Sequence, residues 1–427
     1  MATVCFLEKS PISGIKKRVL ENGITVFLEE LPEHKKVIFL VGIGVGTQEG
    51  TKKLYGIGHF DEHILYHSNR FRTAKEIVEN VEYKGGGLYA GTDFDSAILY
   101  ALGYRHSLSK NIRIIYEIVT NFEYRENEIE REREEILTEF RKAIDAPDEH
   151  YLDHLFIPVL LRKTHVEKPV LGTPKTVKHL TKEDLLTFKR KFFVPANIVI
   201  FVCGKFDEER VIKAIEKTFG RLKPQPFEQE MPRINLINRR RELFKKRKGI
   251  KLAYMALGYR VAGFNHSDSL KLTLIESILS NGMSSRLPQK LRSEKGIGYD
   301  ELAGVYDDYG GIGVFYITIG GFNLRKFKEA KAAVLRELED LKTNLVSKRE
   351  FIRAKNIFLS NKDDEMEDLV ERVEQLSDAY FKKSIFDPRN YKKYISKISR
   401  EAIRRCAQKY FSDKYTLAAL VPENFEK

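Results

Sequence analysis

The strongest constraint on the fold is an internal repeat. Ser399 lies 218 residues after Thr181, and each begins a predicted helix that carries apolar residues at helical spacing. In both copies an aromatic pair at the same offset leads into a predicted strand, Ile198–Cys203 or Thr416–Val421. A repeat spaced by about half of the chain predicts that one α+β domain has been duplicated.

The length of the chain supports the same division. Its 427 residues are too many for one ordinary hydrophobic core. We expect a first domain over residues 1–222, a linker over 223–248 and a homologous second domain over 249–427. The linker contains the basic run Arg239–Lys248, for which a solvated connection and a site for an anionic partner are both open interpretations.

Apolar periodicity predicts the order of strands and helices in each half. In the first half we expect two paired strands and three helices, at Gly23–Glu29, Lys36–Val45, Gly58–Tyr66, Thr73–Glu82 and Glu126–Ile144. The second half repeats this order loosely, with a strand over 251–259, a helix over 267–279 and a strand over 313–319.

Composition narrows the compartment and the partners. The formal net charge is +13, but Lys and Arg are interleaved with Glu along the chain, which is typical of a solvated surface and not of a nucleic-acid site. The cysteines Cys5, Cys203 and Cys406 have no metal or disulfide spacing, which favours free thiols in a reducing cytosol. No run of about twenty apolar residues and no apolar signal core occur, so we expect a cytoplasmic protein without a membrane partner.

The segment His59-Phe60-Asp61-Glu62-His63 carries the clearest chemistry. Histidines four residues apart project from one face of a helix, so both rings can bind one metal ion. Glu62 shares that face. Zinc lowers the pKa of a bound water toward about 7, and an adjacent carboxylate can take its proton during attack on a carbonyl. His59 and His63 are therefore predicted zinc ligands, with Glu62 as the general base.

A catalytic zinc usually takes a third protein ligand, which the Glu-rich helix over 126–144 can supply. Glu132 and Glu139 are two turns apart, so they share one face of that helix with the apolar Ile136. Burying two carboxylates there is costly unless they meet a cation or hydrogen-bond donors. We predict Glu139 as the third ligand and Glu132 as the carboxylate that orients a ligand histidine.

These residues resemble the pitrilysin and insulinase family of metallopeptidases, and in particular its short members such as the mitochondrial processing peptidases. That family has an inverted HxxEH motif followed by a Glu ligand, and here Glu139 lies 76 residues after His63. Asp61 and Tyr89 depart from the family pattern, which usually has an apolar residue and an Asn there. Further similar segments are Gly46–Glu49, Gly85–Gly87, Lys168–Thr173, Asn281–Leu287 and Leu291–Tyr299.

The resemblance implies two similar domains, each a mostly antiparallel sheet covered by helices. It also implies that Arg292 and Tyr299 reach the substrate at the metal site, where Tyr299 helps to stabilise the oxyanion. The expected activity is endoproteolysis of unfolded peptides inside a closing chamber, with one zinc ion per chain. The peptide would pair with the strand Leu88–Thr92. Because the motif, Arg292 and Tyr299 occur in one chain, we expect a homodimer, while a heterodimer with a related subunit stays open.

Two other classes of function are alternatives. The first is a non-catalytic subunit of a family heterocomplex, although such relatives have usually lost the metal ligands that this chain keeps. The second is a nucleic-acid-binding protein, which only the net charge supports. Stoichiometric zinc together with peptide cleavage would separate the endopeptidase from both.

Overall fold

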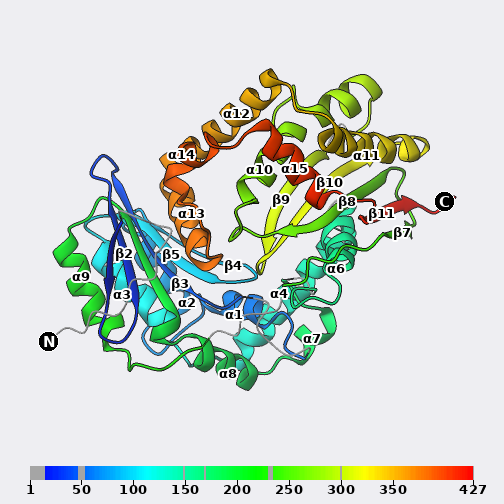
Figure 1. The fold of residues 1–427 in the computed structure, drawn as a ribbon. Coiled ribbons are helices and arrows are strands. Elements are labelled where there is room, and N and C mark those ends of the chain that lie inside the picture. Colours follow the sequence, from blue (N-terminus) through cyan, green and yellow to red (C-terminus); the bar gives the residue numbers. More distant parts are fainter. Residues whose placement is uncertain are drawn as a thin grey trace. The chain divides into compact units, whose positions relative to one another are not determined.

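The computed structural model describes residues 15–46, 53–147, 150–167, 170–228, 234–298 and 301–426. The chain forms two compact units, each with one sheet and helices packed on it (Figure 1). The first unit comprises Met1–Phe140, Val170–Met231 and Glu365–Phe381, and the second comprises Arg141–Pro169, Pro232–Asp364 and Lys382–Lys427. This is the predicted α+β class. Within the described stretches no helix is both long and apolar enough to cross a bilayer.

The first unit has a six-stranded sheet in the order β1-β2-β6-β3-β5-β4. Its strands are β1 Lys16–Val19, β2 Thr25–Glu30, β3 Lys36–Ile43, β4 Gly87–Thr92, β5 Ala97–Tyr104 and β6 Ile198–Gly204. The prediction that β2 and β3 pair with each other is wrong, because β6 lies between them, parallel to β2 and antiparallel to β3. Every residue of β6 is buried, which suits an interior strand whose two edges are both hydrogen-bonded.

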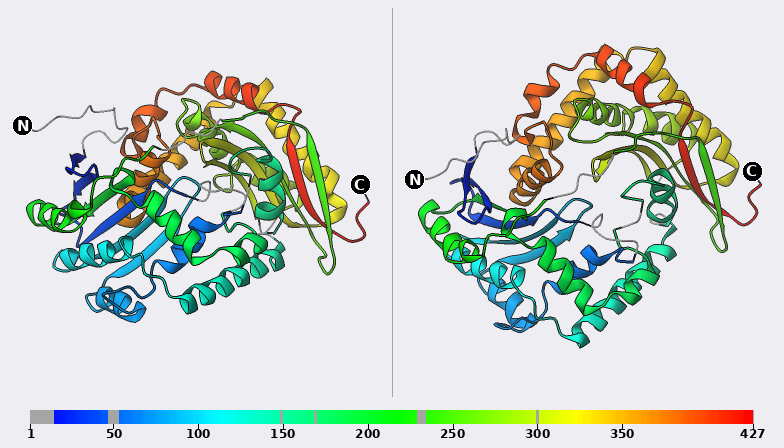
Figure 2. Two further views of the ribbon diagram at one scale, coloured as in Figure 1. Left: turned by 90° about the horizontal axis from the view of Figure 1, so that it is seen from below. Right: turned by 60° about the horizontal axis from the view of Figure 1, so that its bottom comes forward.

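Helices cover both faces of this sheet (Figure 2). They are α1 Ile57–Ile64, α2 Ala74–Glu82, α3 Leu108–Val119, α4 Glu126–Asp145, α7 Pro174–His179, α8 Lys182–Phe192, α9 Glu208–Lys217 and α13 Leu369–Phe381, with 3-10 turns η2 Pro195–Asn197 and η3 Phe219–Arg221. The three predicted helices, α1, α2 and α4, each begin within one residue of the expected start. Apolar residues of α1, α3 and α8 pack on one face, and α13 packs on the other.

The second unit repeats this topology with five strands in the order β7-β11-β8-β10-β9. The strands are β7 Arg241–Arg247, β8 Ala253–Ala262, β9 Glu301–Tyr309, β10 Ile312–Phe322 and β11 Thr416–Pro422. β11 is parallel to β7 and antiparallel to β8, as β6 is to β2 and β3. Thr181 caps α8 and Ser399 caps α15 through their side chains, so the predicted repeat is confirmed. Strand β7 falls within the stretch expected to be a linker. Its two apolar residues, Leu243 and Phe244, are adjacent, so no alternation of apolar and polar residues marks it as a strand.

The helices of the second unit pack mainly on one side of its sheet. They are η1 His150–Phe156, α6 Ile157–Leu160, α10 Ser269–Leu279, η4 Pro288–Ser293, η5 Leu324–Lys326, α11 Phe327–Thr343, α12 Lys348–Glu367, η6 Pro388–Asn390, α14 Tyr391–Ile395 and α15 Arg400–Tyr410. The predicted helix over 267–279 corresponds to α10, and the predicted strands over 251–259 and 313–319 correspond to β8 and β10.

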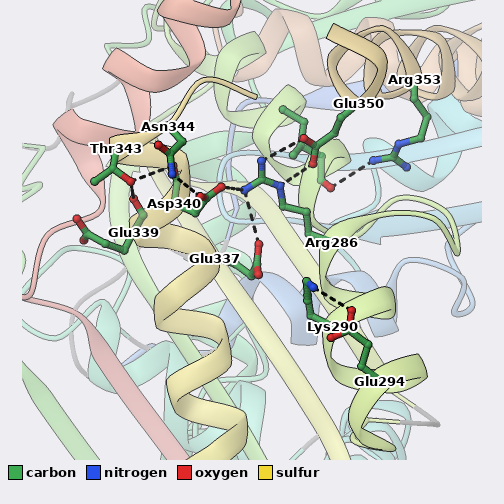
Figure 3. A network of polar contacts seen from close by, with 11 residues as sticks. Arg286, Lys290, Glu294, Glu337, Glu339, Asp340, Thr343, Asn344, Glu350 and Arg353 are labelled. Atoms are coloured by element: carbon green, nitrogen blue, oxygen red, sulfur yellow. Dashed lines mark hydrogen bonds and ion pairs between the residues drawn. The ribbon is translucent and has the colours of Figure 1, made fainter. Parts of the chain in front are cut away.

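Arg286 anchors the segment that leads into η4, the helical turn that carries Arg292 (Figure 3). Its guanidinium makes two bonds to Glu350 on α12, at 2.5 and 3.1 Å, and one to Asp340 on α11, at 2.7 Å. Only 14% of the Arg286 side chain is exposed. A bidentate guanidinium–carboxylate pair in such a site fixes the geometry of both partners. Arg286 therefore ties the start of η4 to two long helices of the second unit.

Asp61 lies on the buried side of α1 and is 2% exposed. Its Oδ1 accepts a hydrogen bond of 2.8 Å from the hydroxyl of Tyr124, two residues before α4 begins. The buried Lys189 of α8 donates to the carbonyl oxygen of Ile118 at 3.2 Å. Burial raises the pKa of Asp61 and lowers the pKa of Lys189 to about 8, while attraction between the two groups opposes both shifts. The departure at Asp61 is thus matched by a buried cation and a tyrosine.

The Arg286→Met variant should lose on the order of 3 kcal/mol of unfolding free energy, because the carboxylates of Glu337, Asp340 and Glu350 lose their shared cation in a largely buried site. Lys290→Gln is the matched control. Lys290 pairs with Glu294 at 2.8 Å at a half-exposed position, where water screens the pair, so its loss should change the unfolding free energy far less. Urea denaturation measures both values, and equal losses would show that the Arg286 network does not anchor this segment.

For Asp61, the test is a double-mutant cycle with Lys189. Asp61→Leu alone should cost on the order of 3 kcal/mol, because it leaves the ammonium buried without its counter-charge. The double variant Asp61→Leu/Lys189→Leu should recover most of that loss, since no charge is then left buried. Lys191→Leu removes an exposed charge from the same helix and serves as the control. Strictly additive losses in the double variant would contradict the pairing.

Candidate metal centre

Helix α1 presents His59 and His63 on one face, and their ring centroids are 4.6 Å apart. Phe60 and Ile64 on the opposite side are buried in the core of the first unit. The chain turns into α1 at Gly56, which has the left-handed φ of 90°. A side chain at Gly172 would lie 2.7 Å from the Cα of Gly56, so the two glycines allow the loop before α7 to pack against the start of α1. Sequence and packing together therefore fix the direction of both imidazoles.

Helix α4 brings the third donor. Its apolar residues Ile129, Ile136 and Phe140 are buried, which turns the neighbouring Glu132 and Glu139 toward α1. One donor atom each from His59, His63 and Glu139 lies within 4.8 Å of the other two. Among the described residues, this is the one group of three or more His, Cys, Asp or Glu side chains with such a geometry.

The distances in this cluster fit a tetrahedral metal site better than hydrogen bonds. Nε2 of His59 lies 3.7 Å from one oxygen of Glu139, and Nε2 of His63 lies 3.6 Å from the other. Hydrogen bonds between nitrogen and oxygen are shorter than this. Ligands held at about 2.0–2.2 Å around a tetrahedral zinc ion are themselves about 3.4 Å apart. The donor set of two imidazoles and one carboxylate is also one that zinc accepts.

Glu132 contacts His63 on the side away from this cluster. Its Oε2 lies 3.2 Å from Nδ1 of His63, and its Oε1 lies 2.9 Å from Nε2 of His67. A proton on Nδ1 of His63 that is donated to Glu132 leaves the lone pair of Nε2 for a metal. Burial alone would raise the pKa of Glu132, but the hydrogen bonds from the two histidines bring it down to about 2. Glu132 thus lies where an orienting carboxylate must be.

His67 is a member of the site that the sequence analysis missed. The side chain is buried, with Arg131 Nη2 at 3.1 Å from its Nδ1. Because arginine only donates, Nδ1 accepts, and Nε2 carries the proton that points at Glu132. His67 lies four residues after His63, and Glu132 lies on the facing helix. That spacing was the available signal, and it gained meaning only once a partner on α4 was known.

The shifted pKa values suit His59 to metal binding and Glu62 to proton transfer. Burial and the neighbouring His63 lower the pKa of His59 to about 4, so this ring is neutral at pH 7 and free to bind a metal. Burial raises the pKa of Glu62, and the nearby carboxylates of Glu139 and Asp61 add to the rise. A carboxylate with a raised pKa is a stronger base than an exposed one. Glu62 also shares its turn of helix with His59 and His63.

Strand β4 is the edge of its sheet among the described residues, as the sequence predicted for Leu88–Thr92. It lies close to α1, since a Cβ at Gly58 would be 3.6 Å from the Thr92 methyl group. Tyr89, the second departure from the family pattern, stacks on Tyr100 of β5 with ring centroids 5.1 Å apart. Tyr89 is 48% exposed, so its ring covers part of the strand face while remaining in contact with solvent.

Arg292 and Tyr299 were expected from the second half. Arg292 belongs to the second unit, on η4, where Nη1 lies 3.8 Å from the sulfur of Met283. Tyr299 lies outside the described residues, as do Thr47–Glu49 and Lys168 among the similar segments.

Most of the chain matches models of one known peptidase family. Residues 25–174 match the insulinase family, peptidase family M16, and residues 179–358 match the M16 inactive domain. A relative from Rickettsia felis, named an uncharacterized zinc protease, is 28% identical over 95% of this chain and 97% of its own length. A relative from Bacillus subtilis, the uncharacterized zinc protease YmxG, is 26% identical over 80% of this chain and 82% of its own length.

Two solved structures share the fold. A protease from Helicobacter pylori superposes with a TM-score of 0.90 at 22% identity, covering 96% of this chain and 100% of that one. A chain from the complex III2 structure of Candida albicans gives a TM-score of 0.80 at 18% identity, covering 95% and 96%. The two family matches adjoin in sequence and together cover residues 25–174 and 179–358. The chain therefore belongs to peptidase family M16 and has both the N-terminal domain and the inactive C-terminal domain of that family.

Proposed function

We propose that this protein is a zinc-dependent endopeptidase that cleaves unfolded peptides and binds one zinc ion per chain. The observation that carries the proposal is the convergence of His59, His63 and Glu139 within 4.8 Å, with Glu62 on the same helical turn as the two histidines. Membership of peptidase family M16 and the names of the relatives, which are zinc proteases, support it.

In this proposal the metal-binding residues belong to residues 1–222, and residues 249–427 contact the substrate. Nε2 of His59, Nε2 of His63 and a carboxylate oxygen of Glu139 hold the ion, and Glu132 keeps the ring of His63 in the binding tautomer. Bound zinc would lower the pKa of a water molecule and polarise the peptide carbonyl.

Glu62 acts as the general base. Its carboxylate takes the proton of the attacking water and then donates it to the nitrogen of the leaving amine. The raised pKa of Glu62 suits both steps, because the group must gain a proton and lose it again at neutral pH. Arg292 and Tyr299 are proposed, from the family resemblance, to contact the substrate, with Tyr299 stabilising the oxyanion.

Strand β4 is the proposed docking site for the peptide backbone. Its outer edge is unpaired among the described residues, and its C-terminal end lies against α1. An extended peptide can add to such an edge through main-chain hydrogen bonds, which tolerate many side chains. Only unfolded segments present a free backbone in this way, so folded proteins would be poor substrates.

The structural likeness to a chain of complex III2 favours a second candidate function, a non-catalytic subunit of a larger assembly. The intact cluster of His59, His63 and Glu139 favours the enzyme, because a scaffold has no need of three converging metal donors. A cytoplasmic location is part of the proposal, and the buried free thiols of Cys203 and Cys406 are in keeping with a reducing compartment.

We also propose that two copies of the chain assemble. The metal cluster and Arg292 occur in one sequence, so a homodimer needs no second gene product, whereas a heterodimer with a related subunit would divide these features. A dimer of this kind would enclose the site and open to admit peptide.

Two variants separate the roles of metal binding and proton transfer. Glu62→Gln should keep one zinc per chain but lose peptide cleavage by about a hundred- to ten-thousand-fold, because an amide cannot accept the proton. His63→Ala should lose both zinc and cleavage, because two remaining ligands do not hold a catalytic ion. Elemental analysis and a fluorogenic peptide assay measure the two properties. Full zinc occupancy in His63→Ala, or near wild-type turnover in Glu62→Gln, would refute the assignment.

The assembly is tested by light scattering together with a series of substrates of increasing size. The homodimer predicts twice the chain mass in solution and cleavage that falls steeply from short peptides to folded proteins. An active monomer that digests folded proteins would eliminate the enclosed site while leaving the metal assignment intact.

A further inference from the structure

Five basic side chains surround a small pocket in the second unit. The pocket has a volume of about 80 Å³ and is lined by Asn235, Ile237 and the basic residues Arg162, Lys163, Arg239, Arg241 and Arg260. We call it the basic pocket. Two of its arginines, Arg239 and Arg241, come from the basic run Arg239–Lys248, for which the sequence left an anionic partner open.

Arg260 on β8 lines the basic pocket and is 3% exposed. Its guanidinium donates to three carbonyl oxygens, of Leu160 at 2.7 Å, Arg162 at 2.6 Å and Asn235 at 3.2 Å. These bonds use three of its five N–H donors and supply no negative charge. A buried guanidinium without a counter-charge is costly, so a bound anion would stabilise this residue.

The neighbouring cations add to the unbalanced positive charge. Arg241 donates to the carbonyl of Val159 at 3.0 Å, and burial together with the charges of Arg162 and Arg239 lowers its pKa. Burial and the charge of Arg241 lower the pKa of Arg260 to about 10. In the part of the chain that the structure describes, none of the five basic side chains has a carboxylate within 4.0 Å. Glu167 comes close, but it accepts from the backbone N–H of Lys163 at 2.7 Å.

Arg240, which lies between Arg239 and Arg241 in the sequence, differs from them because it has an acidic partner. Arg240 lies 3.5 Å from the carboxylate of Glu242, and its guanidinium stacks over the ring of Tyr415 at 5.3 Å. Arg240 is therefore balanced within the chain and does not line the basic pocket. Arg239 and Arg241, its two neighbours in the run, line the pocket and have no carboxylate within 4.0 Å among the described residues.

We propose that the basic pocket binds a phosphate group. Planar guanidinium groups hold phosphate oxygens through paired hydrogen bonds, and several of them suit a dianion better than a single carboxylate. The volume is far below that of pockets for drug-sized ligands, so it accepts a phosphate and no attached base or ring. Inorganic phosphate and the terminal phosphate of a polyphosphate chain present the same chemistry. The bound group would link the turn after α6, the segment before β7 and strand β8.

The test is calorimetric titration of the zinc-loaded protein with inorganic phosphate at constant ionic strength set by chloride. One saturable site per chain is expected. Arg162→Gln/Arg239→Gln should weaken binding by at least about tenfold, because it removes two exposed cations of the pocket. Arg240→Gln removes the same kind of charge one residue away and should change the affinity by less than about twofold. His63→Ala should also bind phosphate normally, which separates this site from the metal centre.

A parallel titration with tripolyphosphate identifies the source of the phosphate group. Equal affinities support free phosphate as the ligand, and at least about tenfold tighter binding of tripolyphosphate supports a chain that extends out of the pocket. Arg260→Met gives a second check, since phosphate should raise the melting temperature of the wild-type protein but not of this variant. The proposal is overturned if phosphate shows no saturable binding, or if the double variant binds it as tightly as Arg240→Gln does.

Discussion

The approach of α1 to α4 is the constraint on which the candidate site depends. Each helix alone carries donors that point in a common direction, but only their packing brings Glu139 to the two histidines of α1. Two polar contacts hold this approach, one from Glu132 to His63 and one from Tyr124 to Asp61. The contact with Glu132 orients the imidazole ring of His63, and the hydrogen bond from Tyr124 holds the buried side of α1.

The duplicated fold places this constraint in one copy only. In the second unit α10 follows β8 as α1 follows β3, yet α10 has buried leucines and isoleucines and no histidine. The match to the M16 inactive domain covers residues 179–358, which include α10, and agrees with that difference. One copy thus keeps polar donors on its first helix, which need partners from α4. The other copy uses the same helix for apolar packing, and its edge strand β7 supplies part of the basic pocket instead.

Local patterns made much of this predictable. The caps of α8 and α15 depend on neighbouring residues, and the structure contains both. The repeat offset and the spacing of the metal-binding residues are separations that can be counted along the sequence. The structure brings His59, His63 and Glu139 together as that spacing predicts. The order of strands in the sheets was not readable in this way, because β6 inserts between β2 and β3 from more than 150 residues away. His67 and Lys189 were missed for the same reason, since their partners lie on other helices. Strand β7 was missed because its sequence has no alternation of apolar and polar residues.

The central claim is that this chain cleaves peptides with a metal held by α1 and α4. The most direct measurement is digestion of a peptide library by the purified protein as isolated, after removal of metal with a chelator, and after return of zinc. The account predicts that cleavage disappears with the metal and returns in full when one zinc ion per chain has been restored, at the same bonds as before. Cleavage that survives complete removal of the metal would contradict it.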